Sequence, residues 1–201
     1  MSTRRIHDRR ADSISAAICQ IVDPTRYGKY AVTVQTILRF PDHHLRATAQ
    51  RVVVFDEDLC SLATDLLDTL RAASAIGITA THIGVLKRLA VIELAAAEGV
   101  RTYVNPQIVW ASADMIRHEE GSVSMPGVTE EIERHARVRM NYQDLSGVEK
   151  IEEAEGLLSV CLQHEVDQLD GIFWIYRLSR LKRDRVVKRF DKTQRTEAPG
   201  D

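Results

Sequence analysis

The sequence has few of the features that mark secreted, membrane or DNA-binding proteins. Its three cysteines, Cys19, Cys60 and Cys161, are odd in number and lack C-x-x-C spacing, which favours a reducing cytosol over a disulfide scaffold. No apolar run approaches the length of a membrane span, and we find no internal repeat and no low-complexity tract. The net charge of −2 argues against capture of DNA by the whole surface. We therefore expect a cytoplasmic protein that contacts neither membrane nor DNA.

The apolar content of the chain is sufficient for one domain. Of its 201 residues, 44% are hydrophobic and 28% are charged, as in ordinary globular proteins. Residues 1–33 show no sustained periodicity, so we predict an extension that is partly disordered. This segment is rich in Arg and Ser like a transit peptide, but Asp8 and Asp12 count against that function. The folded domain is predicted over 34–192, with 193–201 as a tail.

The hydrophobic pattern predicts an α+β fold. Leucines at helical spacing predict a helix over 56–74, and further helices are predicted over 156–171 and over the basic segment 179–192. Other segments predict strands and loops: a β-rich run over 32–45, strands over 88–94 and 101–111, a hairpin over 136–156, and loops over 77–84 and 119–127. The strand at 101–111 is expected to be interrupted at Asn105-Pro106. Strands grouped between helices indicate α+β and not an alternating parallel fold.

The helix predicted over 156–171 contains an incomplete metal-binding pattern. In H-E-x-x-H, two histidines on one helix face hold a metal and the glutamate holds the attacking water. Here His164 and Glu165 are followed by Gln168 at the second histidine position. The rest of the helix is apolar and predicted to be buried, so His164 and Glu165 need partners. Alone, this pattern favours a histidine–carboxylate pair satisfied inside a core helix.

Two other stretches change this interpretation. They are G-I-T-A-T-H-I-G at 77–84 and E-E-G-S-V-S-M-P-G at 119–127. With Q-H-E-V-D-Q-L at 163–169, they resemble the three signature motifs of the peptide deformylase family, G-x-G-L-A-A-x-Q, E-G-C-L-S and Q-H-E-x-D-H-L. The motifs occur in the family's order and at similar spacing, and the resemblance spans about 33–190. Three ordered motifs make a specific match.

The resemblance implies a fold, an activity and a metal. The fold is α+β, with antiparallel sheets around a central buried helix and a basic C-terminal helix. Peptide deformylases remove the formyl group from N-formylmethionine of nascent bacterial chains. They use a divalent metal, typically ferrous iron, held by the cysteine of the second motif and both histidines of the third. The third-motif glutamate is the acid/base, and the first-motif glutamine and a backbone N–H stabilise the oxyanion.

The resemblance implies a residue of this sequence for every role in the family's site, but two of the three metal-ligand positions hold residues of a different type. The ligand positions are Ser122, His164 and Gln168, and the acid/base position is Glu165. The remaining positions are the oxyanion donors His82 and the N–H of Val123, and the substrate pocket of Ile76, Gly77, Leu157, Val160 and Cys161. A serine hydroxyl and a glutamine amide are poor replacements for a thiolate and an imidazole. We therefore expect no metal cofactor and no deformylase activity.

Three arrangements of the altered centre are open at this point. His82 and His164, joined by Glu165, could hold a relocated Fe²⁺ or Zn²⁺ in a working hydrolase. Ser122, His164 and Glu165 could form a metal-free nucleophile, base and orienting group. We favour a third arrangement, in which Ser122, His82, Glu165 and Gln168 hydrogen-bond one another.

The basic segment at the C-terminal end is a candidate contact surface. Residues 180–195 include eight basic and two acidic residues, so this segment carries +6 and the rest of the chain −8. In deformylases a helix of similar position and charge docks on the ribosome, which implies the ribosome or nascent chain as partner. A solvated surface helix with Leu181, Val187 and Phe190 on its apolar side explains the pattern equally well.

Overall fold

The computed structural model describes residues 33–197, so the predicted extension over 1–33 lies almost entirely outside the described residues. Seven strands form two antiparallel sheets, which confirms the α+β prediction. The main sheet has the order β1-β2-β3-β6-β7, with bounds Gly77–Thr79, Leu89–Ile92, Arg101–Ala111, Arg137–Gln143 and Glu149–Glu155. The second sheet is the hairpin of β4 (Met115–Ser122) and β5 (Met125–His135). No helix in the described part of the chain is long and apolar enough to cross a membrane.

Within the described residues, three α-helices pack on these sheets. They are α2 (Glu57–Ala72), α3 (Gly156–Leu169) and α4 (Arg180–Glu197). The Asp56 side chain accepts a hydrogen bond from the Leu59 N–H at 3.0 Å and so caps α2. Short 3-10 turns connect the elements: η2 (His43–Arg46), η3 (Ala80–Ile83), η4 (Ala96–Glu98) and η5 (Trp174–Arg177).

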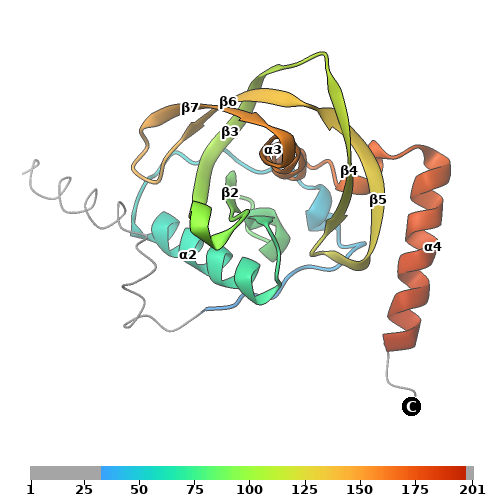
Figure 1. Ribbon diagram of the computed structural model, residues 1–201. Coiled ribbons are helices and arrows are strands. Elements are labelled where there is room, and N and C mark those ends of the chain that lie inside the picture. The colour runs from blue at the N-terminus through green and yellow to red at the C-terminus, as the bar shows by residue number, and fades with distance from the viewer. Residues whose placement is uncertain (1–32, 198–201) are drawn as a thin grey trace, which may run out of the picture.

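Helix α3 is the centre of the molecule. Figure 1 shows it enclosed between the main sheet and hairpin β4–β5, while α4 lies outside β5. Every residue from Ser159 to Leu169 is buried except His164, which is partly exposed. Beyond the helix, Gly171 has a φ of 78°, and a Cβ there would lie 2.6 Å from the Arg46 carbonyl oxygen. The end of α3 is therefore packed tightly against η2.

Some predicted elements differ from the structure. Residues 33–39 run alongside other segments without forming a strand, and the predicted loop 119–127 is the turn end of hairpin β4–β5. Strand β3 continues through Asn105, although the register with β6 shifts there. The Asn105 side chain explains this continuity, because it bonds both the N–H (2.7 Å) and the carbonyl (2.9 Å) of Val52.

The apolar face of α4 also differs in part from the prediction. Phe190 is buried as expected, and Val187 is partly buried. Leu181 is 62% exposed, and Val186 fills the core position instead. Helix α4 thus packs on β5 through its middle and leaves its first turn in solvent.

Candidate functional site

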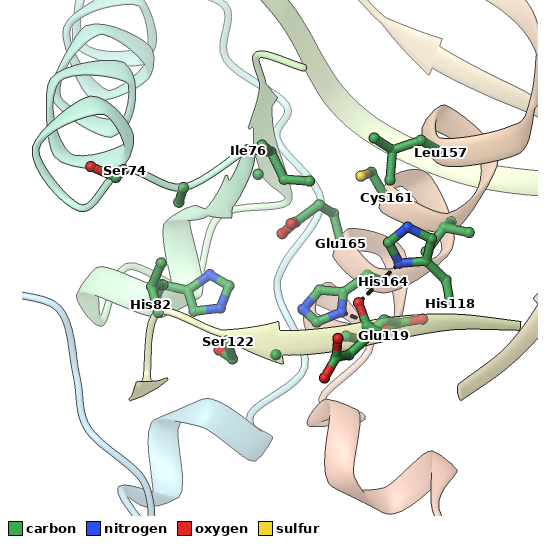
Figure 2. A pocket seen from close by; sticks show the side chains of 16 residues that line it. Ser74, Ile76, His82, His118, Glu119, Ser122, Leu157, Cys161, His164 and Glu165 are labelled. Atoms are coloured by element: carbon green, nitrogen blue, oxygen red, sulfur yellow. Dashed lines mark hydrogen bonds and ion pairs between the residues drawn. The ribbon is translucent and has the colours of Figure 1, made fainter. Parts of the chain in front are cut away.

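A pocket of about 260 Å³ opens between α3, hairpin β4–β5 and the loop that leads from α2 into β1. Figure 2 shows that the His82 and His164 rings face one another across this pocket, with Glu165 on one side and Ser122 on the other. Of the residues predicted from the sequence, all but Gln168 line the pocket: Ile76, Gly77, His82, Ser122, Val123, Leu157, Val160, Cys161, His164 and Glu165. Segments far apart in sequence therefore meet at one site.

The apolar wall of the pocket is built by α3 and the chain before β1. Val160 and Cys161 are buried on α3, whereas Leu157 and Ile76 are about two-fifths exposed, at 40% and 42%, so they can contact a ligand at the mouth. Burial raises the pKa of the Cys161 thiol to about 12, so this side chain is an uncharged apolar group at neutral pH.

His164 is fixed by a carboxylate that the sequence analysis did not identify. Its Nδ1 lies 2.8 Å from Oε2 of Glu120, which is buried on β4. Burial by itself lowers the pKa of the His164 imidazole, but the hydrogen bond to Glu120 and the negative charges of Glu165 and Glu120 together outweigh burial, so the His164 pKa is raised.

The Glu120 carboxylate belongs to a buried ion-pair chain that runs from the pocket to the surface. Arg134 on β5 donates to both Glu120 oxygens, at 2.8 and 2.9 Å, and to the Asp167 carboxylate on α3 at 2.5 Å. Asp167 also accepts from Arg177 of η5, which is partly exposed. Burial acts to raise the pKa of Glu120, but hydrogen bonds from Arg134 and His164 outweigh it and hold the pKa well below its usual range.

His82 is held in one tautomer. The backbone N–H of Thr79 donates to its Nδ1 at 3.0 Å, so Nδ1 carries no proton and the neutral ring must carry it on Nε2. Burial, aided by the charge of His164, lowers the pKa of His82 to about 3, so the ring is neutral at physiological pH. His82 therefore presents an N–H, and not a lone pair, at Nε2.

Glu165 lies at the bottom of the pocket against the backbone of β1. A Cβ at Gly77 would lie 2.2 Å from its Oε1, so only glycine leaves room for this carboxyl group. Burial raises the pKa of Glu165 to about 7.

Ser122 and Gln168 have partners that differ from those predicted. The Ser122 Oγ accepts from the Ser124 N–H at 3.2 Å. The Gln168 amide donates to the Leu45 carbonyl at 2.9 Å and to Thr81 Oγ1 at 3.4 Å, so it connects α3 to η2 and η3. The prediction that Ser122, His82, Glu165 and Gln168 hydrogen-bond one another is therefore wrong. Ser122 and Gln168 bond other groups, and within residues 33–197 no hydrogen bond reaches Nε2 of His82 or Oε2 of Glu165.

The predicted nucleophile set is not assembled either. The carboxylate that orients His164 is Glu120, not Glu165. Among the described residues, no hydrogen bond joins Ser122 to His164, and the serine oxygen accepts from the Ser124 N–H instead. Ser122 thus lacks the adjacent base that would activate a hydroxyl.

The donor set does not fit the divalent metal that the motifs imply. Ser122 offers a neutral hydroxyl, and the Gln168 amide is committed to Leu45 outside the pocket. A relocated metal on His82 and His164 would need a lone pair on His82 Nε2, which carries the proton instead. Within residues 33–197, a group of three close metal-binding side chains occurs only at Asp42, His43 and His44, away from the pocket lining.

Comparison with known proteins agrees with the fold and the motifs. The family model for polypeptide deformylase matches residues 34–184. A Brucella melitensis protein named peptide deformylase-like is 62% identical over 164 residues, which cover 82% of this chain and 100% of that protein. A peptide deformylase of Phenylobacterium zucineum is 43% identical over 165 residues, covering 80% and 97%.

A solved structure gives the same result for the fold. The peptide deformylase from Legionella pneumophila has a TM-score of 0.79 and 36% identity, and the match covers 84% of this chain and 100% of that one. The predicted peptide deformylase fold is thus confirmed. This similarity and the family-model match over residues 34–184 place the chain in the peptide deformylase family. The enzymes of this family are metal-dependent hydrolases.

Proposed function

We propose that this chain is a peptide deformylase-like protein that holds no catalytic metal, does not deformylate, and keeps a pocket for N-terminal peptides. The observation that carries the proposal is the direction of Gln168, whose amide is bonded to Leu45 and Thr81 and not directed into the pocket. A hydroxyl at Ser122 and a single imidazole at His164 leave too few donors for Fe²⁺ or Zn²⁺.

The apolar wall supports retained binding. Ile76, Leu157 and Val160 line the pocket beside Glu165, so a ligand with an apolar side chain can be covered there. The ion pairs of Glu120 and Arg134 keep His164 in place without a metal. His164 is therefore positioned for binding by protein groups alone.

A hydrolysis assay tests this proposal. Purified protein with measured metal content is incubated with N-formyl-Met-Ala, with and without added Fe²⁺ or Zn²⁺, and release of formate is followed. We expect no turnover above the protein-free rate. Hydrolysis at rates of ordinary enzymes, about 1–10³ per second, that is lost in His164→Ala would refute the proposal.

We further propose that α4 contacts the ribosome near the nascent chain, in the cytoplasm. Val186 and Phe190 anchor the helix on β5, and Arg189 donates to the Thr129 carbonyl at 2.8 Å. The basic side chains of Arg185, Lys188 and Lys192 are exposed. A fixed row of cations suits contact with RNA phosphates, since each such contact releases counterions.

A further inference from the structure

A short turn outside the pocket brings three metal-binding side chains together. Asp42, His43 and His44 each offer one ligand atom, and the three atoms lie within 4.8 Å of one another. None of these residues lines the pocket between α3 and hairpin β4–β5. The Oδ1 atom of Asp42 lies 2.9 Å from Nδ1 of His44 and 3.7 Å from Nδ1 of His43. Both imidazoles therefore direct a ring nitrogen toward one carboxylate group.

The turn that carries these side chains is held by the core. The Leu45 side chain is 1% exposed, and its carbonyl oxygen accepts from the Gln168 amide of α3 at 2.9 Å. The Asp42 carboxylate accepts from the backbone N–H of His44 at 2.8 Å and so caps η2. The backbone that positions the ligands is thus fixed before any cation binds, which lowers the entropy lost on binding.

The carboxylate in this group has no arginine or lysine partner within residues 33–197. Its ion pairs there are with His43 and His44, which are charged only when protonated. The hydrogen bonds that Asp42 accepts from the described residues all end on Oδ1. The neighbouring cations along the chain, Arg39 and Arg46, contact hairpin β4–β5 and η5 instead. A negative charge beside two imidazoles is therefore available to a cation.

We propose that Asp42, His43 and His44 form a surface site for a divalent transition-metal cation of the Zn²⁺ class. Imidazole nitrogen combined with carboxylate oxygen suits Zn²⁺, Ni²⁺ or Cu²⁺, whereas Mg²⁺ and Ca²⁺ prefer oxygen ligands alone. The cation replaces the proton between His44 Nδ1 and Asp42, and this proton is released to solvent. The His43 side chain is 86% exposed, so its ring can turn toward the cation, and a water molecule completes four-fold coordination.

This surface site is separate from the metal centre that the sequence motifs imply. Its ligands lie at the start of η2, and none of them belongs to the three motifs. Because none lines the pocket, a cation bound there contributes neither a ligand nor a water to the pocket. The surface site therefore does not depend on the proposed function.

Calorimetric titration of the untagged full-length chain with Zn²⁺ tests the site. We expect one saturable ion per chain in the wild type and also in His164→Ala, which removes the imidazole of the pocket. Mg²⁺ at the same concentrations should not bind. One ion that remains in His164→Ala supports the surface site, even if a second ion, lost in that variant, contradicts the proposed function. No saturable Zn²⁺ binding, or a single ion that His164→Ala removes, would overturn the surface site.

Substitutions at the ligands should weaken Zn²⁺ binding and leave the turn folded. Asp42→Asn keeps a side-chain oxygen that caps η2 but removes the charge, and His44→Phe keeps an aromatic ring without a nitrogen. Each should weaken binding by at least about 10-fold, since changes beside metal ligands already cost about 10–100-fold. His118→Phe is the matched control, because His118 is also exposed and precedes the acidic Glu119. Equal losses in the control and in the ligand variants would overturn the assignment.

The ring signals of the histidines locate the ion without any substitution. In ¹H–¹⁵N spectra, sub-stoichiometric Zn²⁺ should shift the imidazole nitrogens of His43 and His44 first and leave those of His82 and His164 unchanged. This readout holds even where a ligand variant fails to fold. Shifts that appear first at His82 or His164 would place the cation in the pocket and overturn the proposed surface site.

Discussion

At the scale of single residues, the site is defined by side chains whose partners differ from those expected for a metal centre. His82 bonds Thr79, Gln168 bonds Leu45, and His164 bonds Glu120. Each of these bonds fixes a side chain that would otherwise be free to move toward a common ligand. The residues at the centre are therefore held by the fold itself.

The burial of His82 predicts sensitivity to acid. Its pKa is about 3 in the folded protein, against about 6.5 for an ordinary histidine. Between these values the unfolded chain binds the extra proton, so the free energy of unfolding falls as pH decreases below about 6.5. At pH 5 this loss is about 2 kcal/mol.

Urea unfolding of His82→Gln checks this prediction. The variant should lose about 2 kcal/mol less than the wild type between pH 7 and pH 5. His43→Gln, at an exposed position, should behave like the wild type. Identical pH dependence of wild type and His82→Gln would show that His82 is protonated without penalty.

At the scale of elements, the buried arginine on β5 links the hairpin to the central helix. Arg134 pairs with Glu120 of β4 and with Asp167 of α3. Arg134→Met would leave both carboxylates without this cation, and breaking one partner of a buried pair typically costs about 3–5 kcal/mol. The loss should appear as a lower midpoint in urea unfolding.

An exposed ion pair supplies the matched control. Arg139 on β6 pairs with Glu153 at 2.6 Å, with both side chains exposed, so Arg139→Met should cost only about 0–1 kcal/mol. Similar losses of unfolding free energy in Arg134→Met and Arg139→Met would contradict a structural role for the buried ion pairs of Arg134.

The sequence predicts the elements of this site better than their contacts. Leucine spacing and the apolar run of α3 are local signals, so both helices appear at the predicted places. The Glu120–Arg134–Asp167 pairs join residues 14 and 33 positions apart, and no local pattern encodes them. Charged residues within an otherwise apolar helix were the one available signal.

The motifs identify positions, but side-chain direction depends on neighbours. His82 lies at the position expected from the motif and lines the pocket, but its tautomer is set by the backbone N–H of Thr79. Gln168 also lies at the position expected from the motif, but its amide donates to the Leu45 carbonyl and so points away from the pocket. Such contacts form only when distant segments come together.

At the scale of the whole molecule, charge is segregated onto one helix. Residues 180–195 carry +6 and the rest of the chain carries −8. If α4 contacts RNA, co-sedimentation with ribosomes should weaken steeply as salt rises from about 50 to 200 mM. Replacing Arg185, Lys188 and Lys192 by Gln should weaken it further at fixed salt.

A triple variant elsewhere controls for net charge. Arg137, Arg139 and Lys150 are exposed on β6 and β7, and their replacement by Gln changes the net charge equally. We expect this variant to co-sediment like the wild type. Equal losses in the two triple variants would mean that α4 is only a solvated surface helix.

The central claim, loss of the metal site, is tested most directly by metal stoichiometry. Wild type, His164→Ala and the double variant Ser122→Cys/Gln168→His are loaded with Zn²⁺, dialysed, and analysed for bound metal per chain. The account predicts that wild type and His164→Ala retain the same amount, while the double variant retains about one additional ion. One tightly bound ion in the wild type that His164→Ala removes would contradict it.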